Sequence, residues 1–262
     1  MIKVENIEVW GFEHAIRGVR NPMNSWDKSD SHRCSWVKLE KCNECERPHD
    51  YISGARVADE EHYCIGKNDL DLMKRLFNAG TEHRKYLRQI FVSMDILAPL
   101  YWWKEFDTYK VGTVANSCST MHKITAKEFT LDDFSHEHLL VNEKLELIIR
   151  WLNDYREIYV NWNDNLAYID DYGNAVNKKD VWWQMIQLLP SSYNQRRTVT
   201  MNYENVFTII RQRTGHKLDE WNEFVKILKT LPYVMEIGGM NDKGESEDKE
   251  CKMKRCEFFY YL

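Results

Sequence analysis

The stretch from residue 189 to residue 213, LPSSYNQRRTVTMNYENVFTIIRQR, constrains the fold of this chain more than any other. Pro190 ends the apolar run before it, because proline cannot continue the hydrogen-bond ladder of a helix. The β-branched residues Thr198–Thr200 then predict a strand. Asn202 can begin a helix, since its side chain can accept a free backbone N–H of the first turn. The stretch therefore predicts a helix end, a strand and a second helix, in that order.

The helix predicted after Asn202 has polar groups at both ends, because Arg211 and Arg213 fall near its C-terminus. An asparagine at one end and an arginine fork at the other suit a flat, anionic, heteroaromatic ligand. A nucleotide or a flavin fits this description. The apolar side of the helix is formed by Val206, Phe207, Ile209 and Ile210.

The spacing of these residues resembles a signature of a known enzyme family. Leu-Pro, an Asn twelve residues after Pro190 and an Arg eleven residues further on are similar to the C-terminal motif of the flavin-dependent thymidylate synthases. The resemblance implies that Asn202 helps to hold FAD. It also implies that Arg213 is the catalytic arginine that meets the pyrimidine of dUMP, with Arg211 as a further substrate contact.

Several positions depart from the usual pattern of that family. Glu204 stands where an Arg is usual, and Ile186–Gln187 stands where an Arg usually precedes the Leu-Pro. The hallmark Arg-His-Arg triplet is replaced by Thr108–Lys110 or by Tyr109–Val111, according to the register. Lys110 keeps one positive charge, but lysine cannot reproduce the bidentate fork of arginine.

The residues after this triplet keep part of the hallmark. Asn116 and Ser119 retain the family's Asn and Ser with the right separation, whereas Met121 replaces its final Arg. The match implies that Lys110, Asn116 and Ser119 contact the substrate. Asn116 can equally be a satisfied amide in a loop. Ser119 is not predicted to be a nucleophile, because no Gly-x-Ser-x-Gly elbow surrounds it.

Residues 65–125 have an order of elements that is similar to the family's middle section. Asn68 is predicted to cap a helix over 68–79, which Gly80 closes. The alternation of apolar and polar residues predicts a strand over 87–96. Ala98-Pro99 then begins a helix over 99–107, since proline is allowed in a first turn.

A charged cluster lies at the turn between the first of these helices and the strand. It contains Glu82, His83, Arg84 and Arg88. The resemblance implies that these residues bind the cofactor, with His83 or Arg84 meeting flavin phosphates across a subunit interface. For each of them, an ordinary solvated turn is the competing interpretation.

Arg17 and Arg20 lie close in sequence to the polar loop Ser25–Ser31. Arginines beside a serine-rich loop can bind a phosphate in a bidentate manner, so both are candidate substrate contacts. Surface salt bridges explain the same residues equally well.

Residues 32–64 form a cysteine-rich insertion. Cys42 and Cys45 have the spacing of a zinc knuckle, and Cys34 and Cys64 can complete four ligands. Zinc there would be structural, because a closed thiolate site leaves no open position. The competing interpretation is a surface insertion with scattered thiols.

Composition limits the classes of partner. The net charge is −5 and no long basic stretch exists, which argues against duplex nucleic acid. No apolar run is long enough to span a membrane, and the first residues do not have the pattern of a secretory signal. Seven cysteines, an odd number, then indicate reduced thiols or metal ligands. We therefore expect a cytoplasmic protein.

Together these features predict an α+β fold with a mixed sheet and long helices. We expect one domain over 1–262, with the insertion at 32–64 and a mobile tail over 238–252. Further predicted elements are a strand over 2–10 and helices over 142–159, 182–189 and 217–231.

The resemblance implies a homotetramer that reductively methylates dUMP or a related pyrimidine nucleotide. Reduced FAD would carry the one-carbon unit from methylenetetrahydrofolate, and NADPH would reduce the flavin. The competing interpretations are a protein that binds a nucleotide without turnover and a protein that keeps only the fold.

Overall fold

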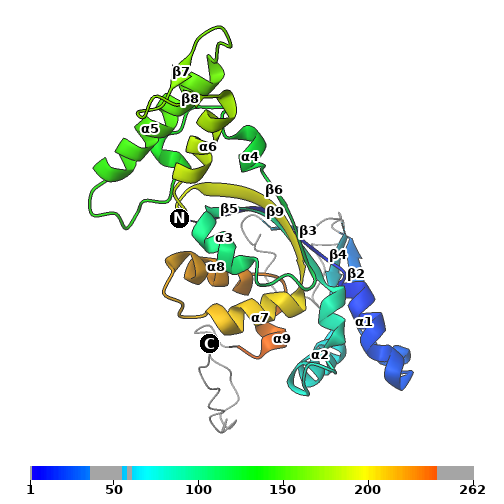
Figure 1. Ribbon diagram of the computed structural model, residues 1–262. Helices are drawn as coiled ribbons and strands as arrows, with labels where there is room; N and C mark the ends of the chain where they lie inside the picture. The colour runs from blue at the N-terminus through cyan, green and yellow to red at the C-terminus, as the bar shows by residue number, and fades with distance from the viewer. Residues whose placement is uncertain (1, 36–54, 58–60, 241–262) are drawn as a thin grey trace.

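The computed structural model describes residues 2–35, 55–57 and 61–240. Figure 1 shows a body built on a β-sheet and a helical arm that projects from one end of that sheet. The fold is α+β, as the sequence predicts. Within the described ranges, no helix is both long and apolar enough to cross a membrane.

The body is organised around a five-stranded sheet with the strand order β3-β1-β5-β9-β6. Neighbouring strands are antiparallel except for β1 and β3, which are parallel. The longest pairing joins β5 to β9, from Phe91 opposite Asn202 to Pro99 opposite Asn194. The strands are β1 (Lys3–Trp10), β3 (Ala55–Val57), β5 (Phe91–Pro99), β6 (Thr113–Ser117) and β9 (Asn194–Asn202).

One face of this sheet is buried by helices. Side chains alternate along β5, so Val92, Met94 and Ile96 all point into the core and are buried. The indole rings of Trp102 and Trp221 lie in the same core. The helices of the body are α1 (Phe12–Arg20), α2 (Lys67–Asn78), α3 (Leu100–Phe106), α7 (Tyr203–Arg213), α8 (Asp219–Lys229) and α9 (Val234–Gly238).

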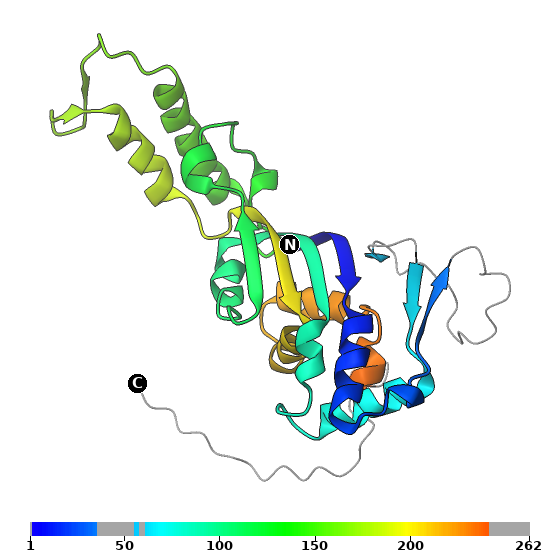
Figure 2. The ribbon, with the colours of Figure 1, turned by 90° about the vertical axis from the view of Figure 1, so that its right-hand side faces the viewer.

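The opposite face of the sheet is polar. Thr198 donates a hydrogen bond to Asp95 at 2.6 Å, and Thr200 donates one to Ser93 at 3.2 Å. Figure 2 presents this face to the viewer, with α7 and α8 behind the sheet. The alternation along β5 and β9 therefore separates a dry core from a hydrogen-bonded surface.

The helical arm has a small core of its own. Leu145, Ile149 and Leu152 of its longest helix pack in one cluster with Met185. The arm projects away from the body in both views (Figures 1 and 2). Its elements are α4 (Thr120–Lys123), α5 (Glu143–Val160), β7 (Tyr168–Ile169), β8 (Ala175–Val176) and α6 (Lys178–Leu188).

A two-stranded ribbon made of β2 (His32–Ser35) and β4 (Glu61–Cys64) lies beside α1. It contains the ends of the predicted cysteine-rich insertion. The centre of that insertion, and the predicted tail beyond residue 240, lie outside the described residues.

The central strand β5 begins later than its alternation predicts. The predicted strand covered 87–96, but Lys85–Gln89 form a 3-10 helix and the strand begins at Phe91. Leu87 and Ile90 are both fully buried. Leu87 lies within the 3-10 helix, so its burial belongs to that helix and not to the strand.

The predicted cap of α2 is wrong. Asn68 lies inside the first turn, and Gly66 occupies the capping position without a side-chain hydrogen bond. The backbone N–H groups of Asn68 and Asp69 donate to the carboxylate of Asp30 at 2.8 and 3.1 Å. A carboxylate from a distant part of the chain therefore replaces the local cap.

Three further elements differ from the sequence prediction. α6 begins at Lys178 and not at 182, because Asn177 and Asp180 form a reciprocal capping box. α1 was not predicted. β6 was not predicted either; it is an edge strand of mostly exposed residues, so it lacks the apolar alternation that reveals a strand.

Candidate functional site

Asn202 lies at the junction between β9 and α7. Its side-chain oxygen accepts a hydrogen bond from the backbone N–H of Asn205 at 3.1 Å, which caps the helix. The predicted cap is confirmed. Asn202 is only 8% exposed, so its position is fixed by the packing around it.

The loop 108–112, which carries the altered triplet, is held against the start of α7 by hydrogen bonds, and we call it the fastened loop. The Asn205 amide donates to the carbonyl of Val111 and to the hydroxyl of Thr113, both at 2.7 Å. Gly112 has a φ of +74°, and a Cβ there would lie only 2.3 Å from Nδ2 of Asn202. Glycine is required for both reasons, and the backbone of the loop is held tightly against the helix.

The three predicted substrate contacts from this region have different surroundings. Lys110 is exposed on the fastened loop, and its side chain has no hydrogen bond or ion pair with another described residue. Asn116 is not in a loop: it lies on β6, opposite Thr198, and is exposed. Ser119 caps α4 by accepting the N–H of His122 at 3.3 Å. Lys110 is therefore the charge that this loop presents outward.

Arg213 is held inside the chain. Its Nε donates to the hydroxyl of Tyr109 at 2.8 Å, and its Nη1 donates to Oε2 of Glu105 at 2.6 Å. The guanidinium carbon lies 4.5 Å from the centre of the Trp221 ring, a cation–π distance. The side chain is 17% exposed. Arg213 therefore joins α3 to α7 and α8.

Glu105 is the centre of the Arg213 cluster, which we define as Glu105, Tyr109, Arg213, His216 and Trp221. Oε2 of Glu105 also accepts a hydrogen bond from the Trp221 indole at 2.9 Å, and His216 lies 3.5 Å away. Among the described residues, Nη2 of Arg213 has no hydrogen-bond acceptor. This nitrogen can meet a ligand without breaking the pair with Glu105.

Arg88, a predicted cofactor contact, forms an ion pair with Glu204 at the first turn of α7. Glu204 is the residue that departs from the family pattern. The carboxylate therefore neutralises a cation that would otherwise be free to meet an anion. Because Arg88 is 55% exposed, solvent screens the pair and it contributes little to folding.

Arg84, another member of the charged cluster, lies on a different side of α7 from Asn205. Arg84 is stacked on Phe77, 5.4 Å from its ring centre, and Phe77 contacts Phe207. Positions 205 and 207 point to nearly opposite sides of a helix, so Arg84 and the loop fastened to Asn205 do not converge. Nε of Arg84 is buried and has no hydrogen-bond partner among the residues that the structure describes.

Glu82 and His83 are exposed in the turn after α2, as the solvated-turn interpretation predicts. Neither side chain has a hydrogen bond or ion pair with another described residue. Arg211 is also exposed on the last turn of α7. These three residues remain predicted ligand contacts. Within the described part of a single copy, their side chains hold no other part of the fold in place.

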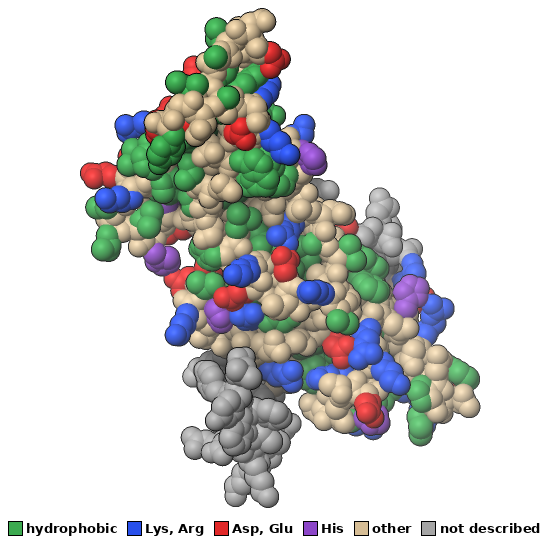
Figure 3. All heavy atoms as spheres, viewed as in Figure 1, with side chains coloured by type: hydrophobic (Ala, Val, Ile, Leu, Met, Phe, Trp, Pro, Cys, Tyr) green, Lys and Arg blue, Asp and Glu red, His purple; other side chains and the backbone are tan. Residues whose placement is uncertain are grey.

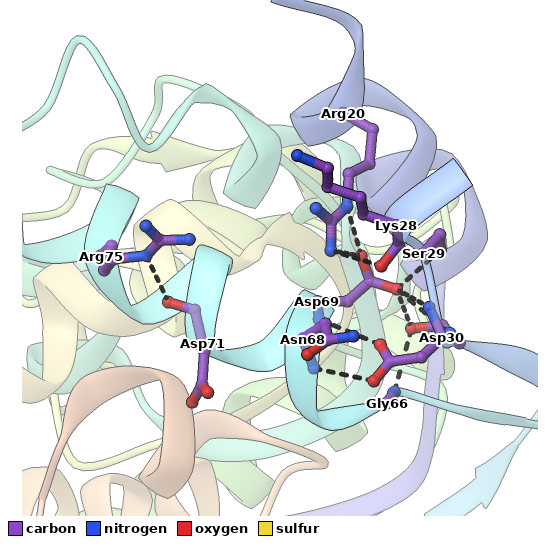
Figure 4. A network of polar contacts seen from close by, with 10 residues as sticks. Arg20, Lys28, Ser29, Asp30, Gly66, Asn68, Asp69, Asp71 and Arg75 are labelled. Carbon is purple, nitrogen blue, oxygen red and sulfur yellow. Dashed lines mark hydrogen bonds and ion pairs between the residues drawn. The ribbon is translucent and has the colours of Figure 1, made fainter. Parts of the chain in front are cut away.

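Arg20 forms a buried network with Asp69 (Figure 4). Nε and Nη2 of Arg20 each lie 2.7 Å from Oδ1 of Asp69, and the hydroxyls of Ser29 and Ser31 donate to Oδ2 at 2.7 and 2.6 Å. Burial raises the pKa of Asp69, but the hydrogen bonds from Ser31, Ser29 and Arg20 outweigh it, so the net pKa is lowered. For Arg20, the salt-bridge interpretation is therefore correct, although the bridge is buried and not on the surface.

Arg17 is exposed and contacts Nδ1 of His14 at 2.8 Å. It lines a hollow of about 280 Å³ beside the network, together with Trp26 and Arg33. Arg33 is paired with Glu13. Arg17 thus remains a candidate for anion binding, with fewer free charges around it than the sequence suggests.

The zinc prediction falls mainly outside the described residues. Cys42 and Cys45 are not described, and Cys34 is described only as part of the β2 backbone. Cys64 is buried. In the described part of the chain, no group of three or more His, Cys, Asp or Glu residues could hold a metal ion.

Sequence reasoning missed four residues that fix this site: Glu105, Asn205, His216 and Trp221. Glu105 and Trp221 are 116 positions apart, and only the fold brings them together. Asn205 is close to the predicted cap, and an Asn-x-x-Asn spacing at a helix start could have indicated that both side chains are used.

Comparison with solved structures places this geometry on a known fold. One neighbour is thymidylate synthase X (ThyX) from Helicobacter pylori with FAD and dUMP: the match covers 90% of this chain and 96% of that chain, at 12% identity and a TM-score of 0.57. This chain has a ThyX-like fold. A second structure, flavin-dependent ThyX from Helicobacter pylori complexed with FAD and dUMP, matches over 89% and 96% at 14% identity and a TM-score of 0.54.

No family model matches the sequence, and no curated protein matches it. The predicted resemblance is therefore confirmed at the level of the fold.

Proposed function

We propose that this protein binds FAD and a pyrimidine nucleotide, and that it reductively methylates dUMP or a related nucleotide. The ThyX-like fold supports this proposal, because it extends over nine-tenths of the chain. The fastened loop beside Asn202 supports it as well, since a rigid backbone at a helix start can orient a ligand.

The residues available for FAD fit a phosphate-bearing group only in part. Lys110 and Nη2 of Arg213 are donors without a partner among the described residues, and Arg84 has an orphaned Nε. Arg88 is engaged by Glu204. Bound FAD would supply the redox and one-carbon chemistry, with methylenetetrahydrofolate and NADPH as co-substrates. The chain would supply orientation and positive charge.

We further propose that the site is shared between copies of the chain in a homo-oligomer, with a tetramer as the expected state. Arg84 and Lys110 lie on different sides of α7, so one copy does not assemble all of the candidate residues. Arg84 of one copy facing the fastened loop of another would complete a site. This arrangement gives a physical reason for oligomerisation.

Within the site, Arg213 is the residue we assign to the pyrimidine. Glu105 and Tyr109 hold the guanidinium of Arg213 in place, so it need not reorganise when negative charge develops on the base. Asn202 acts as a positioning residue, because its carbonyl oxygen is used by the helix cap. Asn116 lies on β6, the neighbour of β9, and Ser119 lies just beyond the end of β6.

Two measurements on the purified full chain test the proposal. The first is uptake of added FAD, followed by the flavin absorbance spectrum. The second is tritium release from 5-tritiated dUMP in the presence of NADPH and methylenetetrahydrofolate. We expect Arg213→Ala to abolish release, and Lys104→Ala, which removes an exposed cation of the same region, to leave it unchanged. A protein that takes up no FAD would contradict the proposal.

A second function, nucleotide binding without turnover, is favoured by two observations. Glu204 neutralises Arg88, and Glu105 neutralises much of Arg213. Both pairs reduce the positive charge available to a reaction with anionic substrates. FAD or dUMP binding without tritium release would support this second function and overturn the first.

A further inference from the structure

A hollow lies on the body between α1, the polar loop 25–31 and the ribbon of β2 and β4. Its volume is about 280 Å³, and its lining includes Ile16, Arg17, Trp26 and Tyr63. No residue of the Arg213 cluster or of the fastened loop lines it. Ligand pockets have volumes of about 300–1,000 Å³, so the hollow has room for one substituted ring and not for a dinucleotide such as FAD. It is therefore a candidate site separate from the one beside α7.

The loop wall of the hollow is held in place by hydrogen bonds. Ser29, which lines it, donates to the buried carboxylate of Asp69 at 2.7 Å (Figure 4). Ser31 also lines it; its hydroxyl donates to Asp69 at 2.6 Å and accepts the backbone N–H of Gly66 at 3.0 Å. These bonds tie the polar loop to the start of α2. A preformed wall of this kind loses less conformational entropy on binding than a flexible one.

The arginines that line the hollow differ in whether a carboxylate neutralises them. Lys, Arg and His side chains, in blue and purple, gather over α1 at the right of the molecule (Figure 3). Arg20 and Arg33 are each in an ion pair with a carboxylate. Arg17 has no ion pair with a described residue, and its contact is with Nδ1 of His14 at 2.8 Å. The lining therefore has one arginine charge without a counter-charge, which suits a ligand with a single negative charge.

The lining also has a flat apolar part. The indole N–H of Trp26 donates to Oδ1 of Asn21 at 2.8 Å, and this bond orients the ring. The side chain is nevertheless 55% exposed, so one face of the indole is available to a ligand. Ile16 is buried in α1 and adds apolar surface to the same hollow. A flat ring that covers these groups removes apolar area from water.

The phenol of Tyr63 is half-buried and stays uncharged. Burial raises its pKa, and the carboxylates of Asp69 and Glu13 raise it further. A hydrogen bond with Ser31 and the positive charge of Arg17 lower the pKa by less. Tyr63 therefore adds an aromatic wall without a negative charge, and it does not repel an anion bound to Arg17.

We propose that this hollow binds a small aromatic carboxylate, whose carboxylate pairs with Arg17 and whose ring lies against Trp26 and Ile16. An arginine holds a carboxylate through two parallel hydrogen bonds. One carboxylate matches the one unneutralised arginine, whereas a phosphate monoester brings about two negative charges at pH 7. The site shares no residue with the Arg213 cluster or the fastened loop, and it does not rest on the proposed function.

Isothermal titration calorimetry of the purified full chain with benzoate tests the proposal. We expect saturable binding with a Kd of about 1 mM or lower, as for other ligands with so few atoms. Acetate should bind at least about tenfold more weakly, because it has no ring to bury. Inorganic phosphate should also bind more weakly than benzoate. Saturating FAD and dUMP should not displace benzoate, since the two sites are separate.

Variants locate the binding to the hollow. Arg17→Gln should weaken benzoate binding at least about tenfold, because the carboxylate loses its charged partner. Trp26→Ala should also weaken it, because the ring loses its flat contact. The matched control is Lys28→Gln: Lys28 is an exposed cation of the same loop but does not line the hollow, and we expect an unchanged affinity. Far-ultraviolet circular dichroism shows whether each variant is folded.

Several results would overturn the proposal. They are an absence of saturable benzoate binding, an equal affinity for benzoate and acetate, tighter binding of inorganic phosphate, and an affinity that does not change in folded Arg17→Gln or Trp26→Ala. Displacement of benzoate by dUMP would also overturn it, because the ligand would then occupy the nucleotide site. None of these results depends on whether the protein takes up FAD.

Discussion

Replacement of Asp69 by Ala should destabilise the body strongly. Asp69 is fully buried, and its carboxylate holds two nitrogens of Arg20 and the hydroxyls of Ser29 and Ser31. The alanine variant leaves the guanidinium of Arg20, itself 5% exposed, without its counter-charge. The network joins α1, the polar loop and α2, so its loss affects three segments together.

The magnitude follows from the burial of the pair. Removing one partner of a buried ion pair costs about 3–5 kcal/mol, because the remaining charge is desolvated and unpaired. A domain has a total free energy of unfolding of about 5–15 kcal/mol, so the change removes a large fraction of it. Asp71→Ala is the matched control: its side chain is exposed on the same helix, and we expect a loss within about 0.5 kcal/mol.

Urea denaturation followed by tryptophan fluorescence measures both variants. The pH dependence adds a second readout. Because the folded-state pKa of Asp69 is lowered, its contribution to stability is present above about pH 4, the ordinary value in the unfolded chain, and is lost as the pH falls through the lower folded value. Equal losses for Asp69→Ala and Asp71→Ala, or an Asp69→Ala variant with unchanged acid sensitivity, would refute the reasoning.

Two further predictions concern the ligand site. Gly112→Ala should destabilise the chain by more than Gly173→Ala in the same urea assay, because both glycines have positive φ but only Gly112 faces a close atom, Nδ2 of Asn202 at 2.3 Å. Equal effects would show that the fastened loop can move aside. Glu204→Gln should change stability little, because the ion pair is exposed, and should tighten FAD binding in a fluorescence titration, since it releases Arg88. Unchanged or weaker affinity would contradict the view that Glu204 blocks an anion contact.

Local sequence signals predicted the elements that depend on neighbouring residues. The Asn202 cap, the strand before it and the long helix α5 are all present, because capping and apolar periodicity act over a few residues. The cap expected at Asn68 failed for the opposite reason. Its N–H is taken by Asp30, 38 positions away, and no local pattern encodes that contact.

The candidate site was predicted as a set of residues but not as a set of interactions. Arg213 is paired with Glu105, 108 positions earlier, and Arg88 with Glu204, 116 positions later. A sequence shows that these charges exist, but only the packing of α3, α7 and the sheet determines which of them are neutralised. The free donors that remain are fewer than the sequence suggests.

The most direct test of the account is the flavin difference spectrum when dUMP is added to the FAD-loaded protein. We predict a spectral change, because the two ligands would share one site beside α7. The change should disappear in Arg213→Ala and persist in Lys104→Ala. An FAD-loaded protein whose spectrum does not respond to dUMP, or a protein that binds no FAD, would contradict the central claim.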